Sequence, residues 1–456
     1  MSRRLFGTDG VRGIVNKELT PEMALRLAQA IGTIFDEGSR ILVGRDVRLG
    51  GYMFKQIVIA GLISSGVKVY DADLIPTPAL QYVVKAEGFD GGVMITASHN
   101  PPEYNGIKVI DSDGIEIPRD KERVVEEIYF SGRFRRVSWR SLAHEAVRYP
   151  EAIDIYVKAV LSHIDKEVVR KKRFKVVIDP ANSVGALTSP RIARELGAKI
   201  ITVNSNLDPF FPGRIPEPTV ESLSETAKIV AETGADFGVA HDGDADRAIV
   251  IDNKGRVQWG DRTATILAKY LAEKHPDLPR RVFTAVSSST VIEDVLRPLG
   301  VEVVWLKVGS VGISRELVKR GGICGFEENG GFMYPLHHPV RDGGMTLALL
   351  LQLLAEENKT LAEMYDELPQ YHVVKTKIPM DRDKAVRVVE RVSEHFKEYR
   401  QITIDGVKVI GKDFWFLVRP SGTEPVLRIM IEARDKEKVN ELLKVIKSIA
   451  EEVITK

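Results

Sequence analysis

The sequence predicts an α/β protein in which three related α/β domains with mixed, mostly parallel sheets precede a smaller α+β domain. The 456 residues are enough for about two to four domains. Short apolar, β-branched runs alternate with helical patterns over most of the chain, which is typical of parallel sheets with crossover helices. Near the C-terminus, several strands follow one another directly. No long linker separates these parts, so we expect four domains packed around one central cleft.

The first domain is expected over residues 1–150. A helix over 20–37 is indicated by Thr20, Pro21 and Glu22, which supply an N-cap, a proline at the first helical position and an acidic first turn. Apolar strands are expected to follow at 41–44, 67–70 and 92–96.

Two further domains repeat this plan over residues 151–252 and 253–369. Strand-helix-strand units restart near Arg173 and near Arg280. The apolar run 345–355 predicts a buried helix, because it is too short for a membrane span and contains Gln352. The expected strands are 176–178, 199–203, 237–240 and 248–251 in the second domain and 282–286 and 301–305 in the third.

The fourth domain is expected over residues 370–456, where neighbouring strands can pair antiparallel. Strands are expected at 373–378, 402–404, 407–410, 415–419 and 427–433, with helices at 382–399 and 436–453.

The composition excludes several classes of protein. The 65 basic and 64 acidic side chains leave a formal net charge of +1, which gives no broad attraction for nucleic acid or an anionic membrane. The single cysteine, Cys324, can form neither an intramolecular disulfide nor a thiolate metal cluster, as expected in a reducing compartment. The first residues lack the apolar core and the small-residue cleavage site of a secretory signal, so we expect none. We therefore expect a cytoplasmic protein that binds a small molecule. Its expected oligomeric state, a monomer or a homodimer, does not follow from the composition.

The segment 96–102 (TASHNPP) directly follows an apolar strand. A serine at the carboxyl end of such a strand, in a turn fixed by Asn-Pro-Pro, lies where open α/β sheets bind their ligands. The Ser98 hydroxyl is therefore a candidate reactive group. In the alternative interpretation, Ser98 and Asn100 only bond their own backbone as turn residues. The segment lacks the G-x-S-x-G pattern of acyl hydrolases.

The segment 241–247 (HDGDADR) lies between two apolar strands and carries alternating acids. Asp242, Asp244 and Asp246 place three carboxylates in one tight loop, the oxygen-rich environment that Mg²⁺ and Ca²⁺ require. The sixth and twelfth positions of an EF-hand loop are occupied by Arg247 and Asn253, which excludes that motif. The alternative is a solvated acidic turn. Mg²⁺ is the better ion if phosphate is nearby.

Two polar loops complete the candidate site. In the segment 419–425 (RPSGTEP), hydroxyls, backbone N–H groups and a guanidinium form an anion nest suited to a phosphate monoester. The segment 325–331 (GFEENGG) offers acids and an amide for sugar hydroxyls or an ammonium group. Taken alone, the first segment is equally compatible with a hydroxyl-rich hairpin turn, whereas the second is more often an ordinary polar loop. Arg12, Arg45 and Lys108 are further cations whose significance depends on the other motifs.

Together these segments resemble the α-D-phosphohexomutase family. TASHNP, DGDADR, EENGG and RPSGTEP occur in the order and at the spacing of that family, and the resemblance spans the whole chain. It implies three related α/β domains and a smaller fourth domain around a central cleft. It also implies phosphate transfer between O6 and O1 of a hexose phosphate, through a phosphoserine, one Mg²⁺ ion and a hexose 1,6-bisphosphate that serves as intermediate and activator.

The resemblance assigns roles to individual residues. Ser98 becomes the phosphoserine, and it binds Mg²⁺ together with the three aspartates. Arg12 and Arg247 neutralise charge at the phosphoserine, and His99 orients it. We expect Lys108 to be the general acid/base. The implied substrate-binding residues are Glu327, Asn329, Arg419, Ser421, Gly422, Thr423 and Arg428.

The choice of hexose is less constrained. The opening segment 5–13 (LFGTDGVRG) is most similar to phosphoglucosamine mutases, which implies conversion of glucosamine 6-phosphate to glucosamine 1-phosphate. A bifunctional phosphomannomutase/phosphoglucomutase is the alternative, and a sugar phosphatase or a non-catalytic sugar-phosphate sensor are alternatives of another class. The residues Phe326 and Ser310 depart from the family pattern, and we expect both near the sugar-reading surface.

Overall fold

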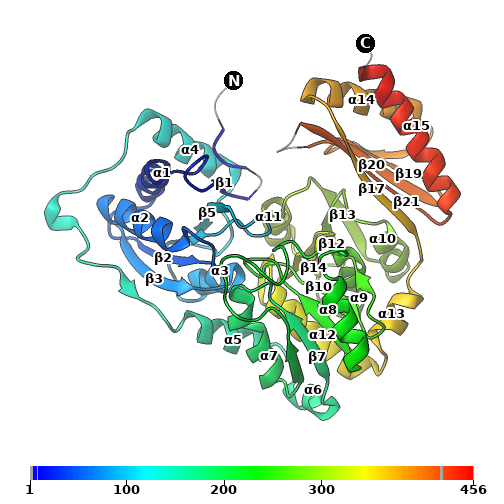
Figure 1. Cartoon of the computed structure of the whole chain (residues 1–456), viewed down its shortest axis with the longest axis horizontal. Coiled ribbons are helices and arrows are strands. Elements are labelled where there is room, and N and C mark those ends of the chain that lie inside the picture. The colour runs from blue at the N-terminus through cyan, green and yellow to red at the C-terminus, as the bar shows by residue number, and fades with distance from the viewer. Residues whose placement is uncertain (1–3, 8, 422–424, 455–456) are drawn as a thin grey trace.

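The computed structural model describes residues 4–7, 9–421 and 425–454. Figure 1 shows four sheets with their helices, following one another from the N-terminal domain on one side to the C-terminal domain on the other. The four-domain α/β and α+β architecture expected from the sequence is confirmed.

The first domain is built on a six-stranded sheet in the order β1-β5-β4-β2-β3-β6. The strands β2, β3, β4 and β6 pair parallel, whereas β5 pairs antiparallel with β4 and β1. The elements are β1 (Val11–Ile14), α1 (Pro21–Ile34), β2 (Arg40–Arg45), α2 (Gly51–Ser64), β3 (Lys68–Leu74), α3 (Thr77–Ala86), β4 (Gly91–Ile95), β5 (Tyr104–Asp111), α4 (Arg119–Ser131), η1 (Trp139–Ser141) and β6 (Val147–Arg148).

The expected first helix is confirmed, and the Thr20 hydroxyl accepts a hydrogen bond from the Met23 amide as its N-cap. The strands β1 and β5 were not predicted. The second and third residues of β5 are Asn105 and Gly106, a pair typical of turns, yet both residues lie inside the ladder with β1.

The second domain has a five-stranded sheet in the order β11-β10-β9-β7-β8, in which β7, β8 and β9 are parallel and β10 and β11 antiparallel. Its elements are α5 (Ala152–Ser162), α6 (Lys166–Lys172), β7 (Lys175–Asp179), η2 (Val184–Leu187), α7 (Ser189–Glu195), β8 (Lys199–Thr202), α8 (Ser224–Thr233), β9 (Phe237–Ala240), β10 (Ile249–Asp252) and β11 (Val257–Gln258).

The third domain has a five-stranded sheet in the order β13-β12-β14-β15-β16, parallel at β12, β13 and β14 and antiparallel at β15 and β16. Its elements are α9 (Gly260–Lys274), β12 (Arg281–Ala285), α10 (Val291–Leu296), η3 (Arg297–Leu299), β13 (Glu302–Leu306), α11 (Ser310–Arg320), β14 (Cys324–Phe326), β15 (Phe332–Tyr334), β16 (His338–Arg341), α12 (Gly343–Glu357) and α13 (Leu361–Glu367).

The fourth domain has an entirely antiparallel sheet in the order β17-β21-β20-β19-β18. The strand expected at 402–404 instead ends at Ile402, ahead of a turn in which Gly406 has φ +77°. The elements are β17 (His372–Pro379), α14 (Arg382–His395), β18 (Arg400–Ile402), β19 (Val407–Ile410), β20 (Phe414–Pro420), β21 (Val426–Ala433) and α15 (Lys436–Ile454).

One hydrophobic core joins the second and third domains to α3 of the first. The predicted helix over 345–355 is the centre of α12, which is buried along this length and packs against α5, α6, α7 and α9. The fourth domain has its own core and meets the third through a small cluster that includes Val286, Trp415 and Leu417. In the described part of the chain, no helix is long and apolar enough to cross a membrane.

Candidate active site

The Ser98 hydroxyl lies in a buried turn that follows β4, at the carboxyl end of the parallel strands. Ser98 has φ +51°, a left-handed conformation that is uncommon for residues other than glycine. Its Oγ donates a 2.6 Å hydrogen bond to Oδ2 of Asp242. The structure therefore brings the predicted nucleophile to the predicted metal-binding loop, although the two are far apart in the sequence.

A buried arginine that sequence reasoning missed supports this turn. The Arg48 guanidinium donates to the carbonyl oxygens of Ser98 and Asn100, at 2.6 Å each, and is paired with Asp46 at 3.1 Å. Asp46 also accepts from the Thr96 hydroxyl at 2.6 Å. Arg45, which was singled out from the sequence instead, pairs with Asp73 of the neighbouring strand β3 at 2.9 Å.

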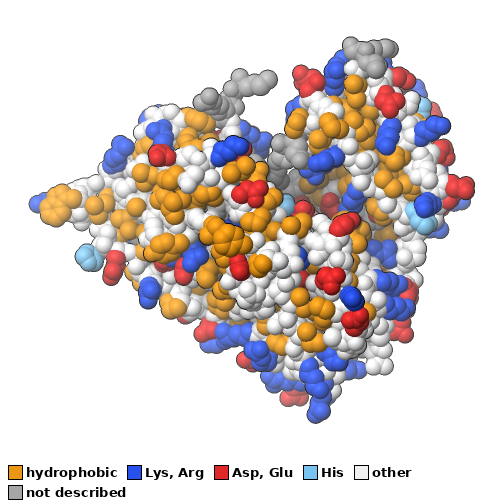
Figure 2. Space-filling model, viewed as in Figure 1, with side chains coloured by type: hydrophobic (Ala, Val, Ile, Leu, Met, Phe, Trp, Pro, Cys, Tyr) orange, Lys and Arg blue, Asp and Glu red, His pale blue; other side chains and the backbone are white. Residues whose placement is uncertain are grey.

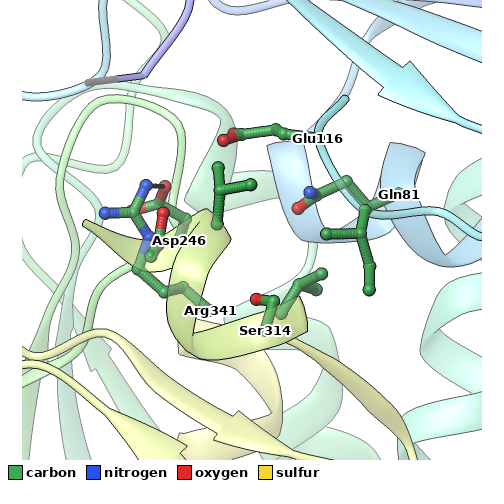
Figure 3. Close-up of a pocket in the computed structure, with 9 residues that line it drawn as sticks. Gln81, Glu116, Asp246, Ser314 and Arg341 are labelled. Atoms are coloured by element: carbon green, nitrogen blue, oxygen red, sulfur yellow. Dashed lines mark hydrogen bonds and ion pairs between the residues drawn. The ribbon is translucent and has the colours of Figure 1, made fainter. Parts of the chain in front are cut away.

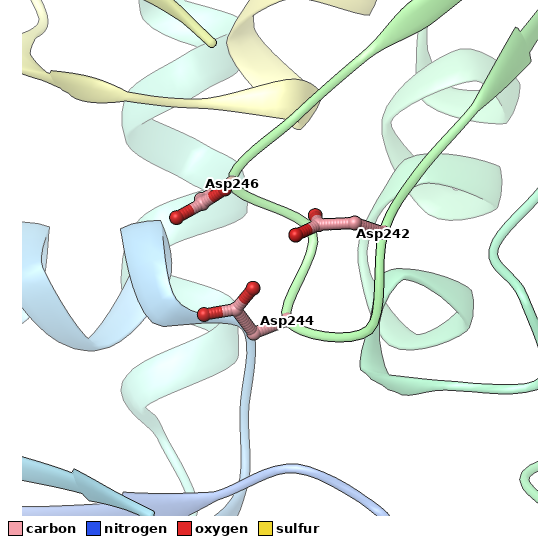
Figure 4. Close-up of side chains that lie close together, drawn as sticks. All are labelled: Asp242, Asp244 and Asp246. Atoms are coloured by element: carbon pink, nitrogen blue, oxygen red, sulfur yellow. The ribbon is translucent and has the colours of Figure 1, made fainter. Parts of the chain in front are cut away.

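The three aspartates converge in the loop between β9 and β10 (Figure 4). All are buried, and one carboxylate oxygen from each lies within 4.8 Å of the others. Gly243 lets this loop approach the first domain, because a Cβ there would lie 2.4 Å from the Ser98 carbonyl oxygen. A larger residue would separate the acids from the serine.

The donor set fits a hard divalent cation. Among the described residues, Oδ1 of Asp244 and Oδ1 of Asp246 are buried without a hydrogen-bond partner, which is costly unless a ligand satisfies them. Burial and the two neighbouring carboxylates raise the pKa of Asp242. A divalent cation would relieve this repulsion, and three carboxylates suit Mg²⁺ when phosphate oxygen completes the shell.

Lys108 is buried on β5 and reaches the same acids. Its Nζ lies 3.0 Å from Oδ2 of Asp244 and 3.4 Å from Oδ2 of Asp246, with Oε1 of Glu116 at 3.5 Å. Burial opposes the charged form, but these carboxylates outweigh it and raise the pKa of Lys108. The side chain is therefore an ammonium group in this arrangement.

Arg341, at the end of β16, is a second buried cation. It contacts acidic side chains of three domains. Its guanidinium donates to Asp246 at 2.6 Å, to Asp9 at 2.9 Å and to Glu327 at 3.2 Å. Figure 3 shows Arg341 and Asp246 beside Glu116, around a cavity of about 10 Å³, room for about one water molecule. Arg341 was not predicted from the sequence. Its position directly before Asp342, the N-cap of α12, was a usable signal.

His99 and the remaining arginines surround the serine. Arg247 Nη2 donates to His99 Nδ1 at 2.9 Å, so that nitrogen carries no proton. The Arg247 charge and burial lower the pKa of His99, which favours an orienting role over proton transfer. Arg12 donates to Oδ1 of Asn100 at 2.8 Å and to the Ala97 carbonyl at 3.2 Å.

Arg247 also lines a cleft of about 470 Å³ between the second, third and fourth domains, within the usual size range of small-molecule sites. Figure 2 shows the molecular surface hollowed between the C-terminal domain and the rest, with charged side chains on the walls. Arg419 and Arg428 line this cleft and lie opposite each other on β20 and β21. Asn329 lines it as well.

The predicted anion nest is only partly described. Ser421 is buried, and its amide donates to the Val426 carbonyl at 2.9 Å. The predicted residues Gly422 and Thr423 lie outside the described residues.

The two residues that depart from the family pattern, Phe326 and Ser310, are both buried, and their expected place near the sugar-reading surface stays a prediction. Phe326 is fully buried in the hydrophobic core, because its strand β14 lies inside the third sheet. Ser310 lines the small cavity beside Asp246, where its hydroxyl contacts Oδ1 of Asp9 at 3.2 Å. Glu327 is buried against Arg341, whereas its neighbour Glu328 lines the cleft.

Family models of the phosphoglucomutase/phosphomannomutase type match the chain in order. Alpha/beta/alpha domains I, II and III match residues 3–136, 154–255 and 259–371, and the C-terminal domain matches residues 376–448.

Individual proteins match over nearly the whole chain. The chain is 56% identical to a phosphoglucosamine/phosphogalactosamine mutase of Sulfurisphaera tokodaii, covering 98% of this chain and 99% of the relative. It is 42% identical to a phosphoglucomutase/phosphomannomutase of Thermococcus kodakarensis, covering 99% of each. The fold is similar to the crystal structure of a phosphoglucomutase/phosphomannomutase family protein from Burkholderia thailandensis, with a TM-score of 0.88, 24% identity and coverage of 98% of this chain and 97% of that chain.

Proposed function

The chain belongs to the phosphoglucomutase/phosphomannomutase family, and from this premise we propose that it is an isomerase that moves phosphate between O6 and O1 of a hexose phosphate. The observation that carries the proposal is the 2.6 Å hydrogen bond from Ser98 Oγ to Asp242, inside the buried acidic cluster. A serine hydroxyl beside a candidate cation site is suited to carry a phosphoryl group.

The reaction proceeds in two balanced transfers. A free hydroxyl of the bound hexose phosphate attacks the phosphorus of phospho-Ser98, a new P–O bond forms, and the bond to Ser98 Oγ breaks. The product is a hexose 1,6-bisphosphate. The sugar hydroxyl loses a proton in this step, and the oxygen of Ser98 gains one. After the sugar has turned over, Ser98 Oγ attacks the phosphorus of the other phosphate, a P–O bond to Oγ forms, and the bond from that phosphorus to the sugar oxygen breaks. Ser98 loses its proton and the freed sugar oxygen gains one, which leaves the isomerised monophosphate and restores phospho-Ser98.

Charge neutralisation and proton transfer are assigned to named side chains. Asp242, Asp244, Asp246 and an oxygen on Ser98 would hold one Mg²⁺ ion, which would supply positive charge to the transferring phosphoryl group. Lys108 is the general acid/base, and its ammonium form favours proton donation first. Arg12, Arg247 and His99 bind and orient the phosphoserine.

The fourth domain holds the phosphate that is not transferred. Arg419 and Arg428 line the cleft on adjacent strands, and guanidinium groups bind phosphate through paired hydrogen bonds. We assign the same role to Ser421, Gly422 and Thr423, and we assign contacts with the sugar to Glu327 and Asn329. Because both ends of the sugar must reach Ser98 in turn, the cleft has to accept two orientations.

The proposed substrate pair is glucosamine 6-phosphate and glucosamine 1-phosphate, and the proposed site of action is the cytoplasm. The mutase of Sulfurisphaera tokodaii, with its 56% identity, supports the amino sugar. The phosphoglucomutase/phosphomannomutase of Thermococcus kodakarensis supports a bifunctional enzyme as the second candidate.

The test is a side-by-side isomerisation assay with Mg²⁺ and a trace of hexose 1,6-bisphosphate. We expect kcat/KM for glucosamine 6-phosphate to exceed the values for glucose 1-phosphate and mannose 1-phosphate. Ser98→Ala should abolish turnover of all three, because the variant cannot carry the phosphoryl group. Release of inorganic phosphate without isomerisation would show a phosphatase instead, and equal turnover of the three sugars would show a general hexose phosphate mutase.

A further inference from the structure

The acidic partners of the Lys108 ammonium group are not equivalent. In the described part of the chain, the carboxylates that form ion pairs with it belong to Asp244, Asp246 and Glu116. Each aspartate is a candidate metal ligand and has a second oxygen without a hydrogen-bond partner, which is available to a cation. Glu116 lies outside the acidic loop, with Oε1 at 3.5 Å from the Lys108 nitrogen. It is therefore the partner of Lys108 that a bound cation does not share.

A cation held by the aspartates would compete with Lys108 for negative charge. Asp246 already accepts a 2.6 Å hydrogen bond from Arg341 in addition to its ion pair with Lys108. A divalent ion brings two further positive charges to the same carboxylates, and like charges repel more strongly in a buried site than in water. An additional carboxylate beside Lys108 offsets that repulsion.

Glu116 is held in place for this role. It follows the turn after β5 and pairs with Ile110 in an isolated antiparallel bridge. Its carbonyl accepts a 2.8 Å hydrogen bond from Arg315 of α11, in the third domain. The side chain is buried, and Figure 3 shows its carboxylate directed toward Asp246 and Arg341 across the small cavity. The carboxylate is therefore in position before a cation or a substrate binds.

Glu116 can carry its charge close to neutral pH. Burial raises the pKa of Glu116 to about 7, although the Lys108 charge opposes this rise. Asp9 and Asp246 contribute to the rise by repulsion. The carboxylate form therefore predominates at about pH 8, one unit above the pKa.

We infer that Glu116 is a positioning residue for Lys108, which balances the ammonium group and keeps it in place when a divalent cation binds the aspartates. The inference rests on the proposed mutase function, in which Lys108 is the general acid/base. It adds an acid that lies outside the sequence motifs of the family. Groups that support the ligands of a metal site typically contribute about 10–100-fold to metal affinity or to activity.

The first test measures the affinity for Mg²⁺ from stability, without an assay of activity. The rise in the free energy of unfolding with Mg²⁺ concentration, followed by urea unfolding at about pH 8, gives Kd. Glu116→Gln removes the charge and keeps the size of the side chain. We expect Kd for Mg²⁺ to rise about tenfold in this variant, because the ammonium group then repels the ion with less compensation.

The second test separates positioning from substrate binding. At saturating Mg²⁺, kcat of Glu116→Gln should fall about tenfold, because Lys108 is held less well. KM for the hexose phosphate should change less than kcat, because Arg419 and Arg428 hold the phosphate in the proposed function. A rise in KM with kcat unchanged would place Glu116 in substrate binding and overturn the inference.

Asp113→Asn is the matched control. Asp113 lies in the same turn and loses one negative charge in the same way, but it pairs with Arg315 instead of Lys108. This variant should keep the Kd for Mg²⁺ and the kcat of wild type. A further comparison uses Lys108→Met, which has no ammonium group to balance. In that background, Glu116→Gln should change Kd by less than about twofold.

The outcomes distinguish the inference from the function on which it rests. A tenfold rise of Kd in Asp113→Asn as well, or in Glu116→Gln within the Lys108→Met background, would overturn the inference, because Glu116 would then not act through Lys108. A Mg²⁺ response in wild type that Glu116→Gln retains in full overturns the inference alone. A wild type whose stability does not respond to Mg²⁺ overturns it together with the metal site of the proposed function.

Discussion

Ser98 has a left-handed backbone conformation, which is unfavourable for a residue that carries a side chain. A left-handed φ costs a non-glycine residue about 1–3 kcal/mol and persists only where the surroundings over-determine it. Here the Arg48 guanidinium bonds two carbonyls of the turn, and the Thr96 hydroxyl accepts from the Ser98 amide at 2.8 Å. The strain aims the hydroxyl at Asp242, which is the direction that phosphoryl transfer beside a cation requires.

Lys108 provides the first prediction at the scale of a residue. Lys108→Met should lower kcat by about 10²–10⁴-fold, the usual contribution of a general acid or base. KM should change by less than the fall in kcat, since the phosphate is held elsewhere, by Arg419 and Arg428. Steady-state kinetics at saturating Mg²⁺ would measure both parameters.

The same substitution needs a check of folding. Removing the Lys108 ammonium leaves Asp244, Asp246 and Glu116 without their shared cation, and breaking a buried pair costs about 3–5 kcal/mol. Urea unfolding at the assay temperature will show whether the variant is folded. A folded variant with unchanged kcat would remove Lys108 from the mechanism.

The site residues that were predicted from the sequence are those that lie in short local motifs. Ser98 and the three aspartates each occupy a loop directly after an apolar strand, so position and chemistry coincide in one segment. Arg48 and Arg341 were missed because the site groups that they contact are distant in sequence, such as the Ser98 and Asn100 carbonyls that Arg48 bonds. Arg341 meets Asp9 and Asp246, and its position before the α12 N-cap does not specify these partners.

At the scale of elements, apolar periodicity predicted the strands that are continuous apolar runs and missed strands such as β5, which carries polar residues. The strands β4 and β9 are continuous apolar runs, whereas β5 contains Asn105, Gly106 and Lys108. These polar residues are buried because β5 lies between β4 and β1 and faces the acidic loop of the next domain. In β5, polar residues that the site requires therefore replace the apolar pattern from which strands are predicted.

The loop between β9 and β10 provides the second prediction. Mg²⁺ that binds the folded protein alone should raise the free energy of unfolding, by about 2.7 kcal/mol at a concentration one hundred times Kd. Asp244→Asn should lose most of this increment, because Asp244 offers one of the unpartnered oxygens. Urea unfolding with and without Mg²⁺ would measure it without any assay of activity.

Asp252→Asn is a suitable comparison for that experiment. Asp252 is also a buried acid of the second sheet, but it pairs with Arg256 at 2.7 Å and stands apart from the three aspartates. This variant should lose stability at every Mg²⁺ concentration and keep the increment. An increment of the same size in Asp244→Asn and wild type would show that Mg²⁺ binds elsewhere.

On the scale of the whole molecule, buried polar residues join the domains. The third and fourth domains meet through Lys408, which lies between the rings of Trp305 and Trp415 and donates to the Ser288 carbonyl. The first and third domains meet through Arg341 and through His338, which approaches the Gly114 carbonyl at 3.1 Å. These groups hold separate domains together around a shared cleft. Their contacts depend on their protonation states, so we expect the stability of these junctions to depend on pH.

His338 makes this dependence measurable. Its Nε2 donates to the Gly114 carbonyl, and its buried Nδ1 has no partner among the described residues. Burial lowers the pKa of His338 to about 3, against an ordinary value of about 6.5. Between these values the unfolded chain binds a proton that the folded protein does not, so stability falls as pH falls from 6.5 towards 3.

His338→Gln should remove this dependence while keeping a donor for Gly114. Each pKa unit corresponds to about 1.4 kcal/mol, so wild type should lose about 2 kcal/mol more than the variant between pH 7 and pH 5. Urea unfolding of both proteins across this range gives the comparison, since the other titrating groups are common to both. Parallel curves would mean that His338 already accepts its proton in the folded protein, and the junction between the first and third domains would then tolerate a charge that its burial disfavours.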